Sequence, residues 1–329
     1  MSSHLSLIQA MVQYLEYCQL DEQSPRTIEG KRCNLQLFVR WYIANVGFSV
    51  ADLTLEGILA FIKHLHSYRD PQNKRLIGKA TRRNKITAVR MFCLYLYQHE
   101  YIKYNLAEKV KTPKADKSIT QAILQPDEVA AIANQTAYYG DYGLRDNAIL
   151  AAFFACGFRR GDVTKLKTNG INVEAKLLFV PDGKGGQDRI VPIAEEALDA
   201  VLYYKDKIRP KQVNFMSGDY LFLDNRGLPF NGGQITALVN KYKRRAGVSK
   251  PGASNLYRHT TATTLLDNGA DLLTVQKVMG HASVSTTQIY THVAVKKMSE
   301  DYQKYHPAVQ NPNLYIPRSH PIYLNLKPS

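Results

Sequence analysis

Residues 148–162 read AILAAFFACGFRRGD, an apolar run of eleven residues followed by Arg159 and Arg160. No residue from Ala148 to Phe158 carries a charged or strongly polar side chain, so every face of a helix formed here has to be buried. Eleven residues are too few to cross a bilayer, because a spanning helix needs about 20. The run therefore predicts a buried helix at the centre of a globular core.

The residues around this run predict a mainly helical domain with one small sheet. Residues 125–128, QPDE, have the proline and the acidic residues of a helix N-terminus. Two β-rich runs, 176–181 and 188–193, flank the glycine-rich segment 182–187 and predict an antiparallel hairpin. Helical patterns resume after the hairpin and continue to about Tyr305.

The first hundred or so residues predict a separate bundle of four or five helices. Apolar residues recur with helical spacing from Leu7 to Leu15, after Ser24, over 52–68 and over 79–101. No strand is needed to explain the pattern of this region.

The chain of 329 residues is long enough for two domains of ordinary size. Residues 109–122 contain a proline, four lysines and few large apolar residues, which is typical of an interdomain linker. Residues 311–329 contain four prolines and no acidic residue, which favours an extended or disordered tail. The predicted organisation is a helical domain over 1–108, the linker, a second domain over 123–309 and a tail over 310–329.

The sequence contains 43 Lys and Arg against 28 Asp and Glu, a net charge of +15. Such a surplus favours a polyanionic partner, because each cation that meets a phosphate releases a condensed counterion. Part of the surplus gathers on the helix expected over 79–101, where Arg82, Arg83, Lys85 and Arg90 accompany an apolar face. This basic face is either a solvated surface or a DNA-facing one.

The four cysteines, Cys18, Cys33, Cys93 and Cys156, are widely spaced and form no C-x-x-C pair. Their spacing favours neither a zinc site nor a disulfide framework, and it fits a reducing cytosol. The N-terminus also lacks the basic region and apolar core of a signal peptide. We expect a cytoplasmic, nucleoid-associated prokaryotic protein that uses no metal and no cofactor.

Five short motifs follow one another in the second half of the chain. They are GFRRGD at 157–162, GKG at 183–185 with DRIVP at 188–192, NLYRHT at 255–260, MGH at 279–281 and STTQIYTH at 285–292. Each motif alone is a weak signal, but their order and intervals are specific. Arg159 and Lys184 are 25 residues apart, Arg258 and His281 are 23 apart, and His281 and Tyr290 are 9 apart. With this set, the region 125–307 resembles the tyrosine recombinase family, most closely its Xer-like and integrase-like members.

The resemblance implies both a fold and a reaction. The fold is mainly α, with a helical N-terminal core-binding domain that clamps DNA and a mostly helical catalytic domain that contains a small antiparallel β-sheet. The reaction is site-specific DNA recombination, in which Tyr290 attacks a phosphodiester and forms a 3′-phosphotyrosyl bond. This bond conserves the energy of the broken linkage, so neither ATP nor a metal is required.

The resemblance also implies roles for individual residues. Arg159 and Arg258 are the expected phosphate-binding pair, since guanidinium groups are planar, always charged and able to bond oxygens in pairs. Lys184 is expected to protonate the leaving 5′-oxygen, and His281 to hydrogen-bond the transferring phosphate. Asp162, three residues after Arg159, is expected on the same helical face, where it orients one of the arginines.

One position departs from the family pattern. Asn255 stands where the family usually has a histidine, and an amide cannot accept the proton of the attacking tyrosine. Asn255 can still bond a phosphate oxygen from the helical face that it shares with Arg258. His259 is a poor substitute, because the next residue of a helix points about 100° away. We therefore expect proton removal through water or His281, or a slower reaction.

The implied partner is double-stranded DNA with specific recombination sites. Four protomers hold two such sites and exchange strands through a Holliday junction, and residues 295–306 are expected to dock on a neighbouring subunit. A partner recombinase or accessory protein is compatible with this scheme. Chromosome dimer resolution, phage integration, resolution of transposon cointegrates and gene-cassette capture all use this chemistry, several of them on mobile genetic elements.

Two other interpretations remain open at the level of sequence. A type IB topoisomerase uses the same tyrosine chemistry on a single duplex, although the Xer-like spacing and the compact size argue against it. A catalytically weak or inactive DNA-binding member of the same fold is supported only by Asn255. Two further histidines, His292 and His306, are expected to be structural or at the surface.

Overall fold

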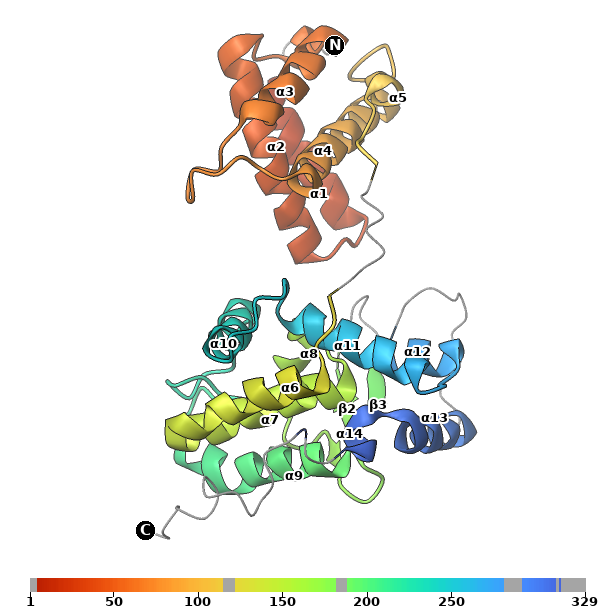
Figure 1. Cartoon of the computed structure of the whole chain (residues 1–329). Coiled ribbons are helices and arrows are strands. Elements are labelled where there is room, and N and C mark those ends of the chain that lie inside the picture. Colours follow the sequence, from red (N-terminus) through yellow and green to blue (C-terminus); the bar gives the residue numbers. More distant parts are fainter. Residues whose placement is uncertain (1–4, 115–121, 182–187, 281–291, 312–313, 315–329) are drawn as a thin grey trace. The chain divides into compact units, whose positions relative to one another are not determined.

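The computed structural model describes residues 5–114, 122–181, 188–280, 292–311 and 314. The chain divides into two compact units, Met1–Ser118 and Ile119–Ser329 (Figure 1). In the described residues both units are mainly helical, and the second contains one antiparallel sheet of three short strands. The fold class predicted from the sequence is therefore confirmed.

The first unit is a helical bundle around a core of its own. Its helices are α1 (Leu7–Leu20), α2 (Pro25–Asn45), α3 (Leu55–Ser67), α4 (Lys79–Gln98) and α5 (Leu106–Lys109), with a 3₁₀ turn η1 (Val50–Asp52). Local chemistry starts these helices: the Ser24 side chain accepts from the backbone N–H of Thr27, and Pro25 occupies the first turn of α2. The four or five helices that we predicted for this region are present.

The second unit is larger and contains most of the elements. Its helices are α6 (Pro126–Asn134), α7 (Gly140–Cys156), α8 (Arg160–Val163), α9 (Glu195–Tyr203), α10 (Gly232–Arg245), α11 (Ser254–Asp267), α12 (Leu272–Met279), α13 (His292–Tyr305) and α14 (Pro307–Gln310). Short 3₁₀ or π turns cover η2 (Gln135–Tyr139), η3 (Tyr204–Ile208) and η4 (Arg209–Lys211).

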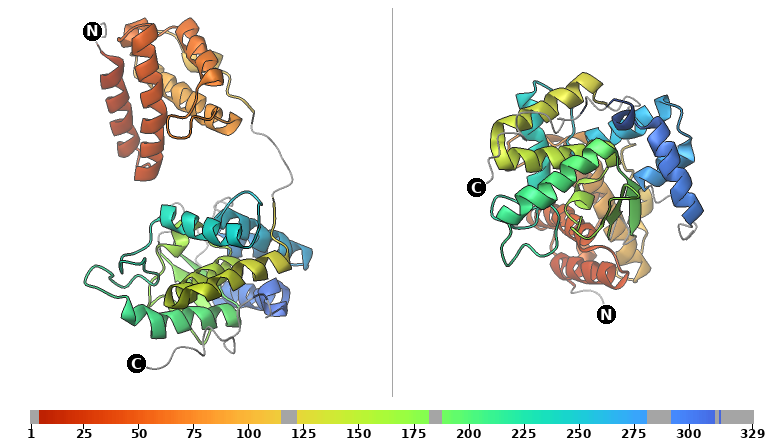
Figure 2. Two further views of the ribbon diagram at one scale, coloured as in Figure 1. Left: turned by 60° about the vertical axis from the view of Figure 1, so that its left-hand side comes forward. Right: turned by 90° about the horizontal axis from the view of Figure 1, so that it is seen from below.

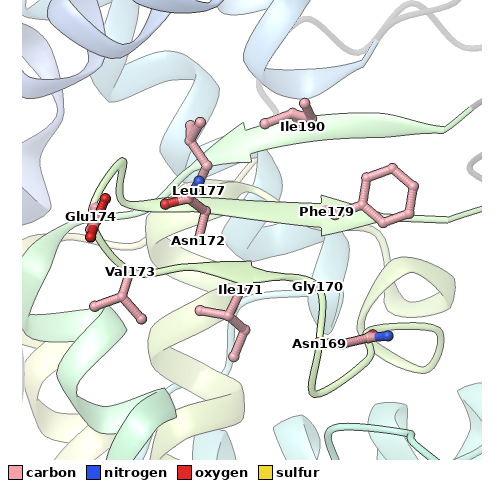
Figure 3. A pocket seen from close by; sticks show the side chains of 9 residues that line it. All are labelled: Asn169, Gly170, Ile171, Asn172, Val173, Glu174, Leu177, Phe179 and Ile190. Carbon is pink, nitrogen blue, oxygen red and sulfur yellow. The ribbon is translucent and has the colours of Figure 1, made fainter.

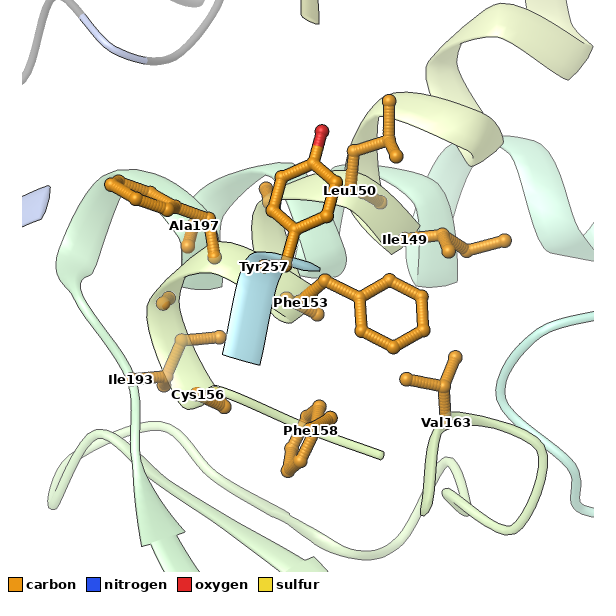
Figure 4. Packing of buried hydrophobic residues seen from close by; sticks show 14 of the residues in the cluster. Ile149, Leu150, Phe153, Cys156, Phe158, Val163, Ile193, Ala197 and Tyr257 are labelled. Carbon is orange, nitrogen blue, oxygen red and sulfur yellow. The ribbon is translucent and has the colours of Figure 1, made fainter. Parts of the chain in front are cut away.

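Helix α7 is the buried centre of the second unit. Figures 1 and 2 show it in the middle of the unit, and it contacts α6, α9 and α11. All its residues from Gly143 to Cys156 are buried, and Figure 4 shows Phe153 and Cys156 packed with Phe158 and Tyr257. This confirms the buried helix predicted from the apolar run. Over the described part of the chain, no helix is both long and apolar enough to cross a membrane.

The sheet pairs β1 (Ile171–Asn172), β2 (Leu177–Val180) and β3 (Arg189–Pro192) in that order. The predicted hairpin is β2 and β3, in a register that sets Val180 opposite Arg189. Strand β1 was not predicted, because two residues are too few to show an alternating pattern.

Alternation along the hairpin gives its two faces different surroundings. Val180, Arg189 and Val191 are buried, while Phe179 is 40% exposed on the opposite face. Phe179 and Ile190 line a surface hollow of about 650 Å³ on this outer side, and their side chains are labelled in Figure 3. The pleat thus places Arg189 on the core side of the sheet.

Candidate active site

Arg159 follows directly from the way in which α7 ends. Gly157 terminates the helix in the left-handed region (φ +58°), where glycine carries no Cβ penalty. Arg159 then adopts an extended conformation (φ −76°, ψ 154°) as the N-cap of the short helix α8. Its Nη2 donates a 3.0 Å hydrogen bond to the carbonyl oxygen of Gly280, and its Nη1 has no hydrogen-bond partner among the described residues. Within the described part of the chain, Nη1 of Arg159 is therefore uncommitted.

Arg258 approaches the same two turns from a different helix. It belongs to α11, is only 6% exposed, and donates from Nη1 to the carbonyl oxygen of Gly157 (2.8 Å) and from Nη2 to that of Met279 (2.6 Å). The structure therefore brings Arg159 and Arg258, separated by 99 residues of sequence, to one place between the end of α7 and the end of α12.

Asp162 does orient this region, but not in the way that its spacing predicted. Its Oδ2 accepts 2.6 Å hydrogen bonds from the backbone N–H of Arg159 and from Nη2 of Arg189. We expected the carboxylate to orient the side chain of Arg159 or Arg258 from a shared helical face. That expectation was wrong because Arg159 precedes α8 as an extended cap, so the three-residue helical spacing does not apply to it.

Arg189 is a buried arginine of the site that the sequence analysis did not single out. It is 6% exposed and forms an ion pair with Asp162, which is 4% exposed. The signal for it was present, since a strand of the pattern Arg189-Ile190-Val191 places the arginine on the same side as a core valine. A charge on the apolar side of a predicted strand indicates a buried partner.

Clustering of the cations disfavours their charged forms. Burial, together with the neighbouring Arg159 and Arg189, lowers the pKa of Arg258 to about 9, while Asp162 opposes the change. Burial and the nearby Arg189 also lower the pKa of Arg159. Among the described residues, three guanidinium groups face the single carboxylate of Asp162, so an anion placed among them is stabilised by the excess positive charge.

Asn255 lies one turn before Arg258 on α11, as its spacing predicted, and its side chain is exposed. His259 is half-buried, and burial together with Arg258 lowers the pKa of its imidazole. At neutral pH His259 is therefore uncharged, and it adds nothing to the positive charge of the cluster.

Lys184, His281 and Tyr290 lie outside the described residues, and so does the side chain of His292. The described part of the candidate site is thus Arg159, Asp162, Arg189, Asn255 and Arg258. In the same part of the chain, no three His, Cys, Asp or Glu side chains come together in a group suited to a metal ion.

The basic face predicted on α4 is largely bound to its own unit. Arg82 donates to the carbonyl oxygen of Ile77, and Arg90 to that of Ala107. Lys85 lies 3.5 Å from Oδ1 of Asn34, and burial lowers the pKa of its ammonium group. Arg83 and Arg90 are exposed, and among the described residues Arg83 is the one of the four without such a contact.

The end of α13 is packed inside its own chain. Tyr302 is fully buried, and His306 is buried between the rings of Tyr302 (4.4 Å between centroids) and Phe154 (5.8 Å). Burial lowers the pKa of His306 to about 3, so it is a neutral structural residue, in line with its expected role. The core of their own unit covers Tyr302 and His306, and docking of residues 295–306 on a neighbouring subunit stays a prediction.

The region of the candidate site is similar to known proteins, and the similarity extends over most of the chain. Residues 122–297 match the family model described as the phage integrase family. The chain is 32% identical over 306 residues to tyrosine recombinase XerC 2 of Ralstonia nicotianae, covering 93% of this chain and 88% of that protein. It is 30% identical over 285 residues to tyrosine recombinase XerD of Halalkalibacterium halodurans, covering 86% of this chain and 92% of that protein.

Solved structures show the same fold at lower identity. The Tn1549 transposon integrase in complex with transposon right end DNA superposes with a TM-score of 0.66 at 15% identity, covering 90% of this chain and 99% of that one. The lambda integrase bound to DNA superposes with a TM-score of 0.65 at 14% sequence identity, covering 91% of this chain and 97% of that one. These likenesses confirm the fold predicted by resemblance.

Proposed function

Because this chain belongs to the phage integrase family and is a site-specific tyrosine recombinase, an enzyme that cleaves and rejoins DNA, we propose that Tyr290 is its nucleophile and that Arg159 and Arg258 hold the scissile phosphate. The observation that carries these assignments is the convergence of the two arginines. Both bind backbone carbonyls at Met279 or Gly280, immediately before His281 and about ten residues before Tyr290.

The proposed chemistry divides among six side chains. The phenolic oxygen of Tyr290 attacks the phosphorus. Negative charge then increases on the non-bridging oxygens, and the two guanidinium groups stabilise this charge most strongly in the transition state. Lys184 protonates the 5′-oxygen as it leaves, and His281 donates to the phosphate. Asn255 also binds a phosphate oxygen and leaves the tyrosine proton to water or to His281.

The proposed assembly follows from what similar proteins are seen to bind. Solved relatives include a lambda integrase dimer bound to a COC' core site and a lambda integrase tetramer bound to a Holliday junction. We assign this chain double-stranded DNA with specific sites, and a homotetramer that exchanges strands through such a junction. An accessory protein or partner recombinase fits the same scheme, and the reaction takes place in the cytoplasm on nucleoid DNA.

The domain roles are also proposals. Residues 1–108 clamp the DNA, and Arg83 is an exposed cation of α4. Residues 109–122 link the two domains, 123–309 carry the catalysis, and 310–329 form a tail. Within that tail, Leu314 is 4% exposed and belongs to the core of the second unit.

A covalent-trapping experiment tests the proposed function. Duplexes that bind the full-length protein are selected from a random-sequence library, nicked near the site, and incubated with wild type and Tyr290→Phe. A nicked strand loses its short end fragment after cleavage, so the 3′-phosphotyrosyl adduct accumulates. We expect an adduct with wild type and none with Tyr290→Phe, and peptide mapping that places the adduct on Tyr290.

Trapping separates the recombinase from a binding-only protein, and plasmid assays separate it from a topoisomerase. A wild-type protein that binds the duplex and never becomes attached is a DNA-binding member of the fold, and the proposal is then wrong. An enzyme that relaxes supercoiled plasmids equally well with and without paired selected sites acts as a topoisomerase. Recombination of plasmids that carry two selected sites, and only those, supports the recombinase.

A further inference from the structure

Arg189 contacts both halves of the described phosphate site. On one side its Nη2 binds Oδ2 of Asp162 at 2.6 Å, and the same oxygen accepts the backbone N–H of Arg159. The carboxylate thus joins the guanidinium of Arg189 to the backbone of Arg159. Rotation of the Arg159 backbone away from the site breaks this 2.6 Å contact.

On its other side, Arg189 packs against the turn after α12. Gly280 has φ +61°, and a Cβ atom added there would lie 2.9 Å from both Cδ and Nη1 of Arg189. The carbonyl oxygen of this same glycine accepts the hydrogen bond of Arg159 Nη2. Arg189 therefore lies between the backbone that carries Arg159 and the turn to which the Arg159 side chain is bound.

Stability alone does not account for this arrangement. Two buried charges are costly to remove from water, and a buried ion pair is often no more stabilising than apolar residues of similar volume. The neighbours on the core side of the strands, Val180 and Val191, are apolar and would accept such a replacement. The charged pair has one further consequence: Arg189 connects the two segments that hold Arg159, its backbone and the Gly280 turn.

We propose that Arg189 is a positioning residue of the recombination reaction, which holds Arg159 and the Gly280 turn in the geometry that the scissile phosphate requires. The inference rests on the proposed function, since it needs Arg159 to bind that phosphate. Arg189 acts through Asp162 and Gly280 and is not itself assigned a contact with DNA.

Arg189→Lys is the main test, because lysine keeps the charge beside Asp162 and loses the planar fork that also reaches Gly280. The measurement is the single-turnover rate of adduct formation on the nicked duplex described above. We expect a rate lower by ~10- to 100-fold, the scale for a misplaced catalytic group. The affinity for intact duplex and the melting temperature are expected to stay close to wild type. The matched control is Arg209→Lys, whose arginine also binds backbone carbonyls, at Gly218 and Tyr220, and whose rate should not change.

A second substrate separates positioning from a general loss of structure. A methylphosphonate at the scissile position lacks one non-bridging negative charge, so a well-placed Arg159 matters less for it. The deficit of Arg189→Lys should shrink to within about threefold on this substrate. An equal deficit on both substrates means a structural role and overturns the proposal, as does a wild-type rate on the ordinary phosphate.

A double variant covers the case in which Arg189→Lys does not fold. Arg189→Met with Asp162→Leu removes both charges and leaves an apolar pair. The same substrate-dependent deficit in this variant supports the proposal, and wild-type rates overturn it. Failure of the proposed function is distinguishable throughout, because in that case wild type forms no adduct at Tyr290 on either substrate.

Discussion

The hydroxyl group of Tyr302 donates a 2.8 Å hydrogen bond to the carbonyl oxygen of Ala155 and accepts a 3.0 Å hydrogen bond from the backbone N–H of Ala194. Ala155 lies two residues before Gly157, where α7 ends and the chain turns toward Arg159. One side chain of α13, the helix that follows Tyr290 in the chain, is thus fixed to the helix that leads to Arg159.

Replacement of this hydroxyl tests how firmly α13 is held. Tyr302→Phe leaves a buried carbonyl and a buried N–H without their partner, and we expect the free energy of unfolding of the second unit to fall by about 1 to 3 kcal/mol. Urea denaturation measures the change. Tyr138→Phe is the control, because that residue is 78% exposed. Equal unfolding midpoints for the two variants would contradict the anchoring role.

His306 predicts a pH dependence of stability. Its ordinary pKa of 6.5 is lowered by burial to about 3 in the folded chain. Between these values the unfolded chain binds a proton that the folded chain does not, so stability is full above about pH 6.5 and falls as the pH drops toward 3. The slope from this group is at most about 1.4 kcal/mol per pH unit.

The measurement is the melting temperature from pH 7 to 4.5 for wild type and His306→Gln. Glutamine keeps a hydrogen-bond donor and does not titrate in this range. We expect a shallower decline in the variant, whatever its stability at pH 7. Parallel curves for the two proteins would show that His306 does not bind a proton when the chain unfolds in this pH range.

The cluster of arginines predicts stabilisation by oxyanions. Among the described residues, Arg159, Arg189 and Arg258 face the carboxylate of Asp162. Burial first, and then the neighbouring guanidinium groups, lower the pKa values of Arg159 and Arg258. A bound sulfate offsets that repulsion and stabilises the folded state by RT ln(1 + [L]/Kd). We expect the melting temperature to rise more with sulfate than with chloride at equal ionic strength, and the difference to shrink in Arg159→Gln. If chloride were as effective, or the variant responded like wild type, a specific oxyanion site would be ruled out.

Asn255 predicts a gain of function. Asn255→His supplies a group that accepts the tyrosine proton, and at an exposed position it should leave stability unchanged. We expect single-turnover cleavage to accelerate by about 10-fold or more, with a rate that rises through about pH 6.5 as the new imidazole loses its proton. Asn255→Gln is the control and should show neither effect. An unchanged rate in Asn255→His would mean that proton removal does not limit cleavage in this chain.

Local patterns were enough to predict much of the fold. The buried run from Ala148 to Phe158, the hairpin around 182–187 and the helix starts at Ser24 and Gln125 all depend on neighbours within a few residues. Periodicity and capping act over this range, so one sequence suffices to recognise them. The two-residue strand β1 was not predicted, because it is a strand through its pairing with β2 and has no sequence pattern of its own.

The order and spacing of Arg159, Arg258, His281 and Tyr290 were sufficient to recognise the resemblance to the tyrosine recombinases, and that family is confirmed, while the roles of the individual residues stay predictions. The side-chain partners of these residues were decided only by the tertiary structure. Asp162 meets Arg189 across 27 residues, and Tyr302 meets Ala155 across 147. Contacts of that length depend on how helices and strands pack, and local periodicity encodes which face is buried without specifying the side chain that it meets.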